Sequence, residues 1–181
     1  MSTSPYEKTV LESGIRVVSG PMTGVKSASL IFYHEIGSRY ENPSIQGVSH
    51  FLEHMLFKGT ERRPDPIMIT QAVESVGGIL NAATGRESTN FWAKVPSTHF
   101  ALAFDVIADV LCNSIIDGAE LDKERSVIIE EIRSIMDAPE DLVHDVIDEV
   151  IWGAQSVGRP IAGTEETVNA IDQAAMHSFW K

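Results

Sequence analysis

The sequence has a single cysteine, few basic residues and no long run of apolar residues. The lone Cys112 cannot form a disulfide within the chain, so a disulfide-stapled fold is excluded and a reducing compartment is favoured. Only 14 lysines and arginines stand against 26 acidic residues, which gives a net charge of −12. Nucleic acids and anionic membranes are bound through clustered basic side chains, so this charge argues against both as partners. It is compatible with a metal cation or a basic peptide.

Signals for membrane insertion or export are also missing. No stretch of about 18 apolar residues is present, so we expect no membrane-spanning helix. Residues 1–5 are mostly polar, and residues 6–20 contain no apolar run of the length that a signal peptide needs. We therefore expect no signal or transit peptide and a cytoplasmic location.

The 181 residues, 43% of them hydrophobic, suffice for one folded domain. Strand patterns with turn residues are frequent in the first half, and helical periodicity dominates afterwards. This order predicts an α+β fold, with a mainly antiparallel sheet packed against several helices. The predicted strands are 7–11, 15–19, 25–36, 79–84 and 88–95, and the predicted helices are 47–57, 65–76, 99–112, 117–136, 139–152, 165–171 and 172–181.

The last predicted helix keeps its apolar spacing up to the final residue, Lys181, and no glycine cap follows it. A domain usually ends less abruptly. We therefore expect residues 1–181 to be a truncated piece of a longer protein.

Residues 50–54 (HFLEH) form an H-x-x-E-H motif inside a predicted helix. Residues four apart lie on one helix face, so His50 and His54 can bind one ion with Glu53 beside them. Imidazole is a favoured zinc ligand, and a carboxylate next to a zinc-bound water can take its proton. This residue order is the inverted zincin motif. The alternative is two surface histidines on an amphipathic helix.

Catalytic zinc sites typically have three protein ligands, so a third must come from elsewhere in the chain. The acidity is concentrated in residues 117–149, where twelve acidic residues are opposed by three basic ones. Within this stretch, Glu124 and Glu131 are seven residues apart and share a helix face. One of them can bind the metal while the other orients a histidine or the water. Most of the other acids, Glu130 among them, are expected to form a solvated surface.

Four segments together resemble the pitrilysin-type (M16, inverted zincin) zinc metallopeptidases in that family's order and spacing. They are residues 50–60 (HFLEHMLFKGT), 77–91 (GGILNAATGRESTNF), 124–132 (ERSVIIEEI) and 158–164 (GRPIAGT). The compact spacing and the last segment are most similar to the branch of bacterial and mitochondrial processing peptidases. The four segments span nearly the whole chain.

The resemblance implies one zinc ion per chain, bound by His50, His54 and Glu131. It also implies that Glu53 is the catalytic general base and that Glu124 supports the catalytic site without completing it. The implied activity is zinc-dependent endopeptidase cleavage of extended or unfolded peptides. The alternative function is a non-catalytic scaffold or partner subunit of a two-component peptidase. Such relatives generally lose parts of H-x-x-E-H, which is intact here.

The same resemblance implies a substrate-binding edge strand at residues 79–84, to which an extended peptide adds as a further strand. Asn81 and Ala82 would then lie near the scissile bond. Alternatively, Asn81 is a hairpin residue with a local hydrogen bond.

Asp141 and Asp145 are four residues apart on a predicted helix, and their placement is similar to that of acids in the mitochondrial branch that favour basic residues near the cut. A solvated acidic face is the alternative. The histidines outside the motif, His144 included, have no matching partners and are expected to be structural or surface residues.

Members of this family are built from two homologous halves that close around the substrate, and this sequence resembles the first domain alone. We therefore expect residues 1–181 to be the N-terminal catalytic domain. The C-terminal half would be absent, or a homologous subunit would supply it in a homodimer or heterodimer. A di-iron carboxylate protein is a further alternative, but it needs paired Glu-x-x-His motifs, which the sequence lacks.

Overall fold

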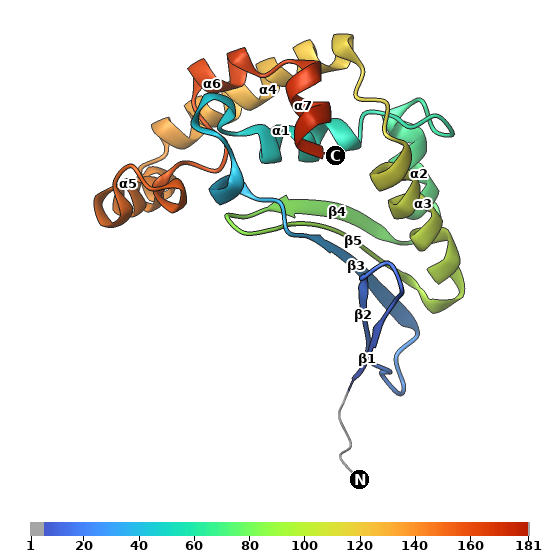
Figure 1. Cartoon of the computed structure of the whole chain (residues 1–181). Helices are drawn as coiled ribbons and strands as arrows, with labels where there is room; N and C mark the ends of the chain where they lie inside the picture. The colour runs from blue at the N-terminus through green and yellow to red at the C-terminus, as the bar shows by residue number, and fades with distance from the viewer. Residues whose placement is uncertain (1–5, 181) are drawn as a thin grey trace.

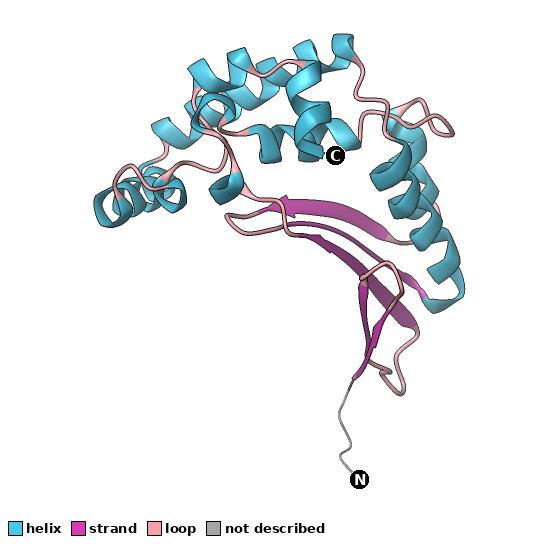
Figure 2. Ribbon diagram, viewed as in Figure 1, coloured by secondary structure: helices cyan, strands magenta, loops and turns pink. Residues whose placement is uncertain are grey.

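The computed structural model describes residues 6–180 and confirms the α+β fold. A three-stranded antiparallel sheet carries the helices on one face, and a separate two-stranded hairpin precedes it in the chain (Figures 1 and 2). No helix in the described part of the chain combines the length and apolar character that crossing a membrane requires.

Every predicted strand and helix is present, and each end lies within two residues of its predicted position. Lys181, at the end of the last predicted helix, and residues 1–5 lie outside the described residues. The strands are β1 (Glu7–Val10), β2 (Arg16–Ser19), β3 (Ser27–His34), β4 (Ile79–Thr84) and β5 (Thr89–Pro96). The α-helices are α1 (Val48–Leu56), α2 (Pro66–Glu74), α3 (Phe100–Asn113), α4 (Gly118–Asp137), α5 (Pro139–Trp152), α6 (Glu165–Ala170) and α7 (Gln173–Trp180).

The main sheet has the order β3-β5-β4, with both neighbours of β5 antiparallel to it. Side chains alternate between the two faces of a strand, and on β5 the buried apolar side chains are those of Phe91, Ala93 and Val95. The opposite face remains exposed at Ile31 and Tyr33 of β3. Because β4 comes last in the strand order, it is an edge strand, and one of its faces is turned towards the helices.

Helix α1 lies at the centre of the core. The apolar side chains that it buries are Val48, Phe51, Leu52, Met55 and Leu56, each at most 2% exposed. Burying side chains of this size contributes roughly 1.5–3 kcal/mol each. This packing fixes the rotation of the helix, and it therefore sets the direction in which the polar residues of the H-x-x-E-H motif point.

The N-terminus of α1 is capped by a carboxylate from an earlier loop. Glu41 is buried and accepts hydrogen bonds from the backbone N–H of Gly47 (2.7 Å) and of Ser49 (2.8 Å). Gly47 has φ +92°, and a Cβ there would lie 2.5 Å from the carbonyl oxygen of Ala162. The carboxylate of Glu41 therefore caps the helix, at the positive end of the helix dipole.

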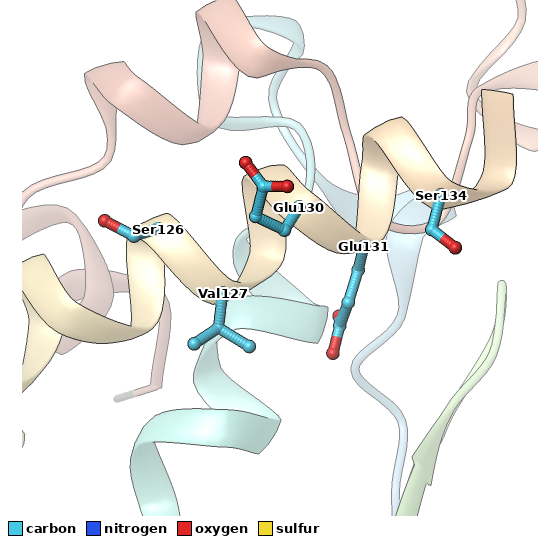
Figure 3. Close-up of a pocket in the computed structure, with 5 residues that line it drawn as sticks. All are labelled: Ser126, Val127, Glu130, Glu131 and Ser134. Atoms are coloured by element: carbon cyan, nitrogen blue, oxygen red, sulfur yellow. The ribbon is translucent and has the colours of Figure 1, made fainter. Parts of the chain in front are cut away.

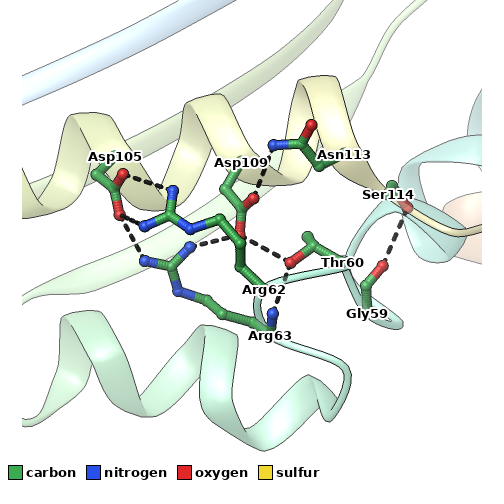
Figure 4. A network of polar contacts seen from close by, with 8 residues as sticks. All are labelled: Gly59, Thr60, Arg62, Arg63, Asp105, Asp109, Asn113 and Ser114. Carbon is green, nitrogen blue, oxygen red and sulfur yellow. Dashed lines mark hydrogen bonds and ion pairs between the residues drawn. The ribbon is translucent and has the colours of Figure 1, made fainter.

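The loop that follows α1 is attached to α3 by a network of polar contacts (Figure 4). Asp109, whose side chain is fully buried, accepts hydrogen bonds from the hydroxyl of Thr60 at 2.7 Å and from the guanidinium of Arg63. Arg63 also pairs with Asp105 at 2.6 Å, and Arg62 pairs with the same carboxylate at 2.8 Å. The network thereby anchors the C-terminal end of the helix that carries the motif.

Candidate metal centre

Helices α1 and α4 bring the two motif histidines and one glutamate together. Nε2 of His50 lies 3.8 Å from Oε2 of Glu131, and Nε2 of His54 lies 3.7 Å from the same oxygen. One ligand atom from each of the three residues lies within 4.8 Å of the others. The two histidine side chains are each 20% exposed and that of Glu131 is 43% exposed, so solvent reaches the group.

The chemistry and spacing of this group fit zinc. Four-coordinate zinc, bound at about 2.0–2.1 Å, sets neighbouring ligand atoms roughly 3.4 Å apart in tetrahedral geometry. The separations of 3.7 and 3.8 Å are close to that spacing. Two imidazoles and one carboxylate occupy three positions, which leaves a fourth position for water or substrate.

Glu124, two helical turns before Glu131 on α4, lies behind His54. Its Oε2 accepts a hydrogen bond from Nδ1 of His54 over 3.1 Å, and its side chain is only 9% exposed. With the proton on Nδ1, Nε2 of His54 has a free lone pair, and this atom faces Glu131. A histidine that binds a metal through Nε2 requires this arrangement. Glu124 therefore lies outside the ligand group, in contact with one of its histidines.

His50 has a different environment. Its Nδ1 is buried and has no hydrogen-bond partner among residues 6–180. Burial, together with the nearby charge of His54, lowers the pKa of His50 to about 4. The imidazole of His50 is therefore neutral at pH 7, which is the form that binds a metal.

The neighbouring glutamates 130 and 131 leave α4 in opposite directions (Figure 3). The side chain of Glu130 is 72% exposed and pairs with Arg133 at 2.7 Å, as expected of a solvated carboxylate. Helix periodicity places Glu131, and not Glu130, on the side that meets α1.

Glu53 extends from α1 towards strand β4. Its Oε2 accepts a hydrogen bond from the hydroxyl of Thr84, with 2.5 Å between the oxygens. Burial raises the pKa of Glu53 above its ordinary value, and the hydrogen bond from Thr84 and the charge of His54 oppose that rise. A carboxylate with a raised pKa is well suited to accept and return a proton near neutral pH. The sequence did not predict the contact with Thr84.

The two residues predicted for substrate binding on β4 lie on opposite faces of that strand. Ala82 is half-buried on the face towards the helices, which it shares with Thr84, whereas Asn81 is exposed on the other face. Oδ1 of Asn81 accepts a hydrogen bond from the backbone N–H of Ala82 over 2.8 Å. That local bond is the one expected if Asn81 is a hairpin residue.

A cavity of about 500 Å³ opens beside His50. Its lining includes His50, Glu131 and Thr84 on one side and residues of α5 on the other. The α5 residues are Asp141, His144 and Asp145. Burial raises the pKa of Asp145. The two aspartates predicted to contact substrate therefore share one cavity with the candidate metal centre. His144 lines it as well, and nothing in the sequence pattern distinguished that histidine.

Comparison with known proteins identifies relatives across this whole region. The sequence matches the family model described as Insulinase (Peptidase family M16) over residues 16–165. An uncharacterized zinc protease of Streptomyces coelicolor is 40% identical over 174 residues, which cover 96% of this chain and 38% of that protein. The chain spans about two fifths of the length of the curated relatives it matches.

Solved structures share the fold at lower identity. A protease from Helicobacter pylori aligns with a TM-score of 0.90 at 22% identity, over 96% of this chain and 42% of that one. A peptidase M16 inactive domain from Pseudomonas fluorescens aligns with a TM-score of 0.88 at 15% identity, over 97% and 42%. These likenesses concern the fold alone. With the family match over residues 16–165 and the 40% identity to the Streptomyces protein, the chain belongs to peptidase family M16.

Proposed function

We propose that this chain is the zinc-binding, catalytic domain of a zinc-dependent endopeptidase. The observation that carries the proposal is the convergence of His50, His54 and Glu131, with Glu53 next to them on α1. The donor set suits zinc, and the neighbouring carboxylate suits a general base. The peptidase family and the zinc protease that it resembles support the same function.

In this proposal each residue has one task. Bound zinc acts as a Lewis acid and lowers the pKa of a bound water. His50, His54 and Glu131 would hold the ion, and Glu124 would keep the proton of His54 at Nδ1. Thr84 holds Oε2 of Glu53, so Oε1 takes the proton of the attacking water and passes it to the leaving amine.

The proposed substrate is an extended or unfolded peptide with basic residues near the scissile bond. Strand β4 is an edge strand, so its outer backbone groups are available for pairing with a peptide near Asn81 and Ala82. Pairing through the backbone recognises an extended shape more than particular side chains. Asp141 and Asp145 line the cavity next to His50, where their charges would attract arginine or lysine.

We further propose that residues 1–181 act together with more protein, either a C-terminal half or a homologous subunit. The chain covers only 38–42% of the relatives described above, which supports this organisation. Helix α5 is consistent with it, because it exposes a set of large apolar side chains: Val143, Val146, Ile147, Val150 and Ile151. Contiguous apolar surface of this kind marks an interaction site.

A non-catalytic scaffold is the alternative, and the inactive domain from Pseudomonas fluorescens has this fold. The fold is common to both functions and therefore supports neither over the other. Here the three candidate ligand residues are present and converge, and Glu53 lies on the same helix as the two histidines, which supports the enzyme.

The test measures zinc content and peptide cleavage in parallel, for the wild type and for Glu53→Gln. We expect one zinc per chain in both proteins, and cleavage only in the wild type. Cleavage is assayed with the chain alone and within a protein of the relatives' full length. Cleavage that survives Glu53→Gln excludes Glu53 as the base. A chain that binds no zinc favours the scaffold, and two irons per chain favour a di-iron protein.

A further inference from the structure

Lys58 lies behind the candidate metal centre. It contacts Glu124, which in turn contacts the candidate ligand His54. Its Nζ is 2.5 Å from Oε1 of Glu124, and Oε2 of the same carboxylate accepts the hydrogen bond from Nδ1 of His54 over 3.1 Å. The side chain of Lys58 is 27% exposed, and that of Glu124 is 9% exposed. The three side chains form a continuous chain of contacts from the histidine to the edge of the solvent.

The end of helix α1 places Lys58 there. Phe57 ends the helix, and the backbone N–H of Lys58 still donates to the carbonyl of Met55 at 3.1 Å. A lysine suits this position because the last carbonyls of a helix carry partial negative charge. The side chain crosses from α1 to α4, so the ion pair joins the helix of the histidines to the helix of Glu131.

The buried carboxylate of Glu124 depends on its two partners. Among residues 6–180 its ion pairs are those with Lys58 and His54. A carboxylate that is nearly removed from solvent is costly without a cation and hydrogen-bond donors. Lys58 supplies the cation at Oε1, and with that oxygen held, the other oxygen is aimed at His54. Without Lys58, the carboxylate would be expected to turn towards water or to rotate away from the imidazole.

We propose that Lys58 is a positioning residue for the metal centre. Acting through Glu124, it holds His54 with Nδ1 protonated and Nε2 directed at the metal, and it thereby sets the affinity for zinc. The inference rests on the proposed function, because it requires that His54 binds zinc. It adds a residue that touches neither the metal nor its ligands.

The experiment measures the dissociation constant for zinc by competition with a chromophoric chelator, and the visible absorption spectrum of the Co²⁺-substituted chain. Lys58→Met, which keeps the side-chain length and removes the charge, should weaken zinc binding about 10-fold or more, as loss of an outer partner of a ligand commonly does. It should also change the Co²⁺ spectrum. Lys58→Arg should keep the affinity within about threefold, because it restores a cation that can donate to Glu124.

Lys123→Met is the matched control. Lys123 precedes Glu124 on α4 and also pairs with a glutamate at 2.5 Å, but its side chain is 69% exposed and its partner is Glu120. The Lys123→Met variant should bind zinc with the affinity of the wild type. In a Glu124→Gln background, Lys58→Met should cause no further loss, since Lys58 acts through that carboxylate.

Three results would overturn the role of Lys58. These are wild-type affinity in Lys58→Met, failure of Lys58→Arg to restore binding, or a further loss in the Glu124→Gln background. Circular dichroism checks that each variant is folded, and Lys58→Gln replaces Lys58→Met under the same expectations if the latter does not fold. A wild-type chain that binds no zinc contradicts the proposed function instead, so the two failures are distinguishable.

Discussion

Thr84 on strand β4 donates a hydrogen bond to Oε2 of Glu53 on helix α1, with 2.5 Å between the two oxygens. Strand and helix are thereby joined at the carboxylate proposed as the general base. Thr84 and Ala82 lie on the same face of β4, so the strand proposed to pair with a peptide also orients the group that would act on it. In the proposed function this one short contact would couple substrate placement to proton transfer.

Replacing the hydroxyl of Thr84 should therefore slow catalysis without removing zinc. Thr84→Val keeps the shape of the side chain and deletes the hydrogen bond, and we expect kcat to fall about tenfold with KM nearly unchanged. Thr84→Ser retains the hydroxyl and serves as the control, with kcat close to that of the wild type. Steady-state kinetics and zinc content check the prediction. Equal kcat values in Thr84→Val and the wild type would contradict it.

The buried His50 should make the metal-free chain sensitive to mild acid. The pKa of His50 is lowered from 6.5 to about 4, so between these values the unfolded chain binds more protons than the folded chain. The contribution of His50 to the free energy of unfolding is therefore fully present above pH 6.5 and is lost as the pH falls towards 4. From pH 7 to pH 5 the part of the loss in unfolding free energy that is due to His50 should be about 2 kcal/mol.

Urea unfolding of the metal-free chain at several pH values measures this loss. Burial also lowers the pKa of His34, which adds to the loss, whereas Glu41, Glu53 and Asp145 have raised pKa values and act in the opposite direction. They are present in both proteins when the wild type is compared with His50→Gln, so the difference isolates His50. The wild type should lose more stability than the variant on acidification. Parallel pH profiles would show that burial does not hold His50 neutral.

The pattern of elements and the helix faces that carry the candidate ligands could be predicted because each depends on residues close in sequence. The choice of Glu131 over Glu124 as third ligand came from the family resemblance. A four-residue spacing puts His50 and His54 on one helix face, and a seven-residue spacing does the same for Glu124 and Glu131. Such spacing states which side chains share a face. It does not state which element that face meets.

The contacts that sequence reasoning missed all join different elements, and most of these elements are distant in the chain. Glu41 caps α1 from a preceding loop, Thr84 reaches Glu53 across 31 positions, and Lys58 meets Glu124 across two helices. His144 lines the cavity only because α5 turns back towards α1 after Pro139. Their partners are determined by tertiary packing, which periodicity does not encode. Only the polar character of Glu41 and Lys58 next to a helix end was a usable signal.

The acidic side of the cavity should determine which peptides are cleaved. If Asp141 and Asp145 attract basic residues, a peptide with Arg near the scissile bond should be cleaved about tenfold faster than the same peptide with Ala. Asp145→Asn should reduce this ratio, whereas Glu149→Gln, an exposed change on the same helix, should not. The ratio of the kcat/KM values for the Arg and the Ala peptide, determined for each protein, measures this preference. Equal rates for both peptides with the wild type would contradict a preference for basic residues.

The loop after α1 offers a stability test with neighbouring arginines. Arg63 and Arg62 both pair with Asp105, but the side chain of Arg63 is 12% exposed and also pairs with the fully buried Asp109, whereas that of Arg62 is 56% exposed. Breaking a buried pair leaves an uncompensated charge, so Arg63→Met should cost about 3 kcal/mol of unfolding free energy. Arg62→Met should cost less than about 1 kcal/mol, because exposed pairs contribute little. Urea unfolding at pH 7 compares the two variants. Equal losses of unfolding free energy would mean that the buried carboxylate of Asp109 does not need the ion pair with Arg63. The loop would then be held mainly by the hydrogen bond from the hydroxyl of Thr60.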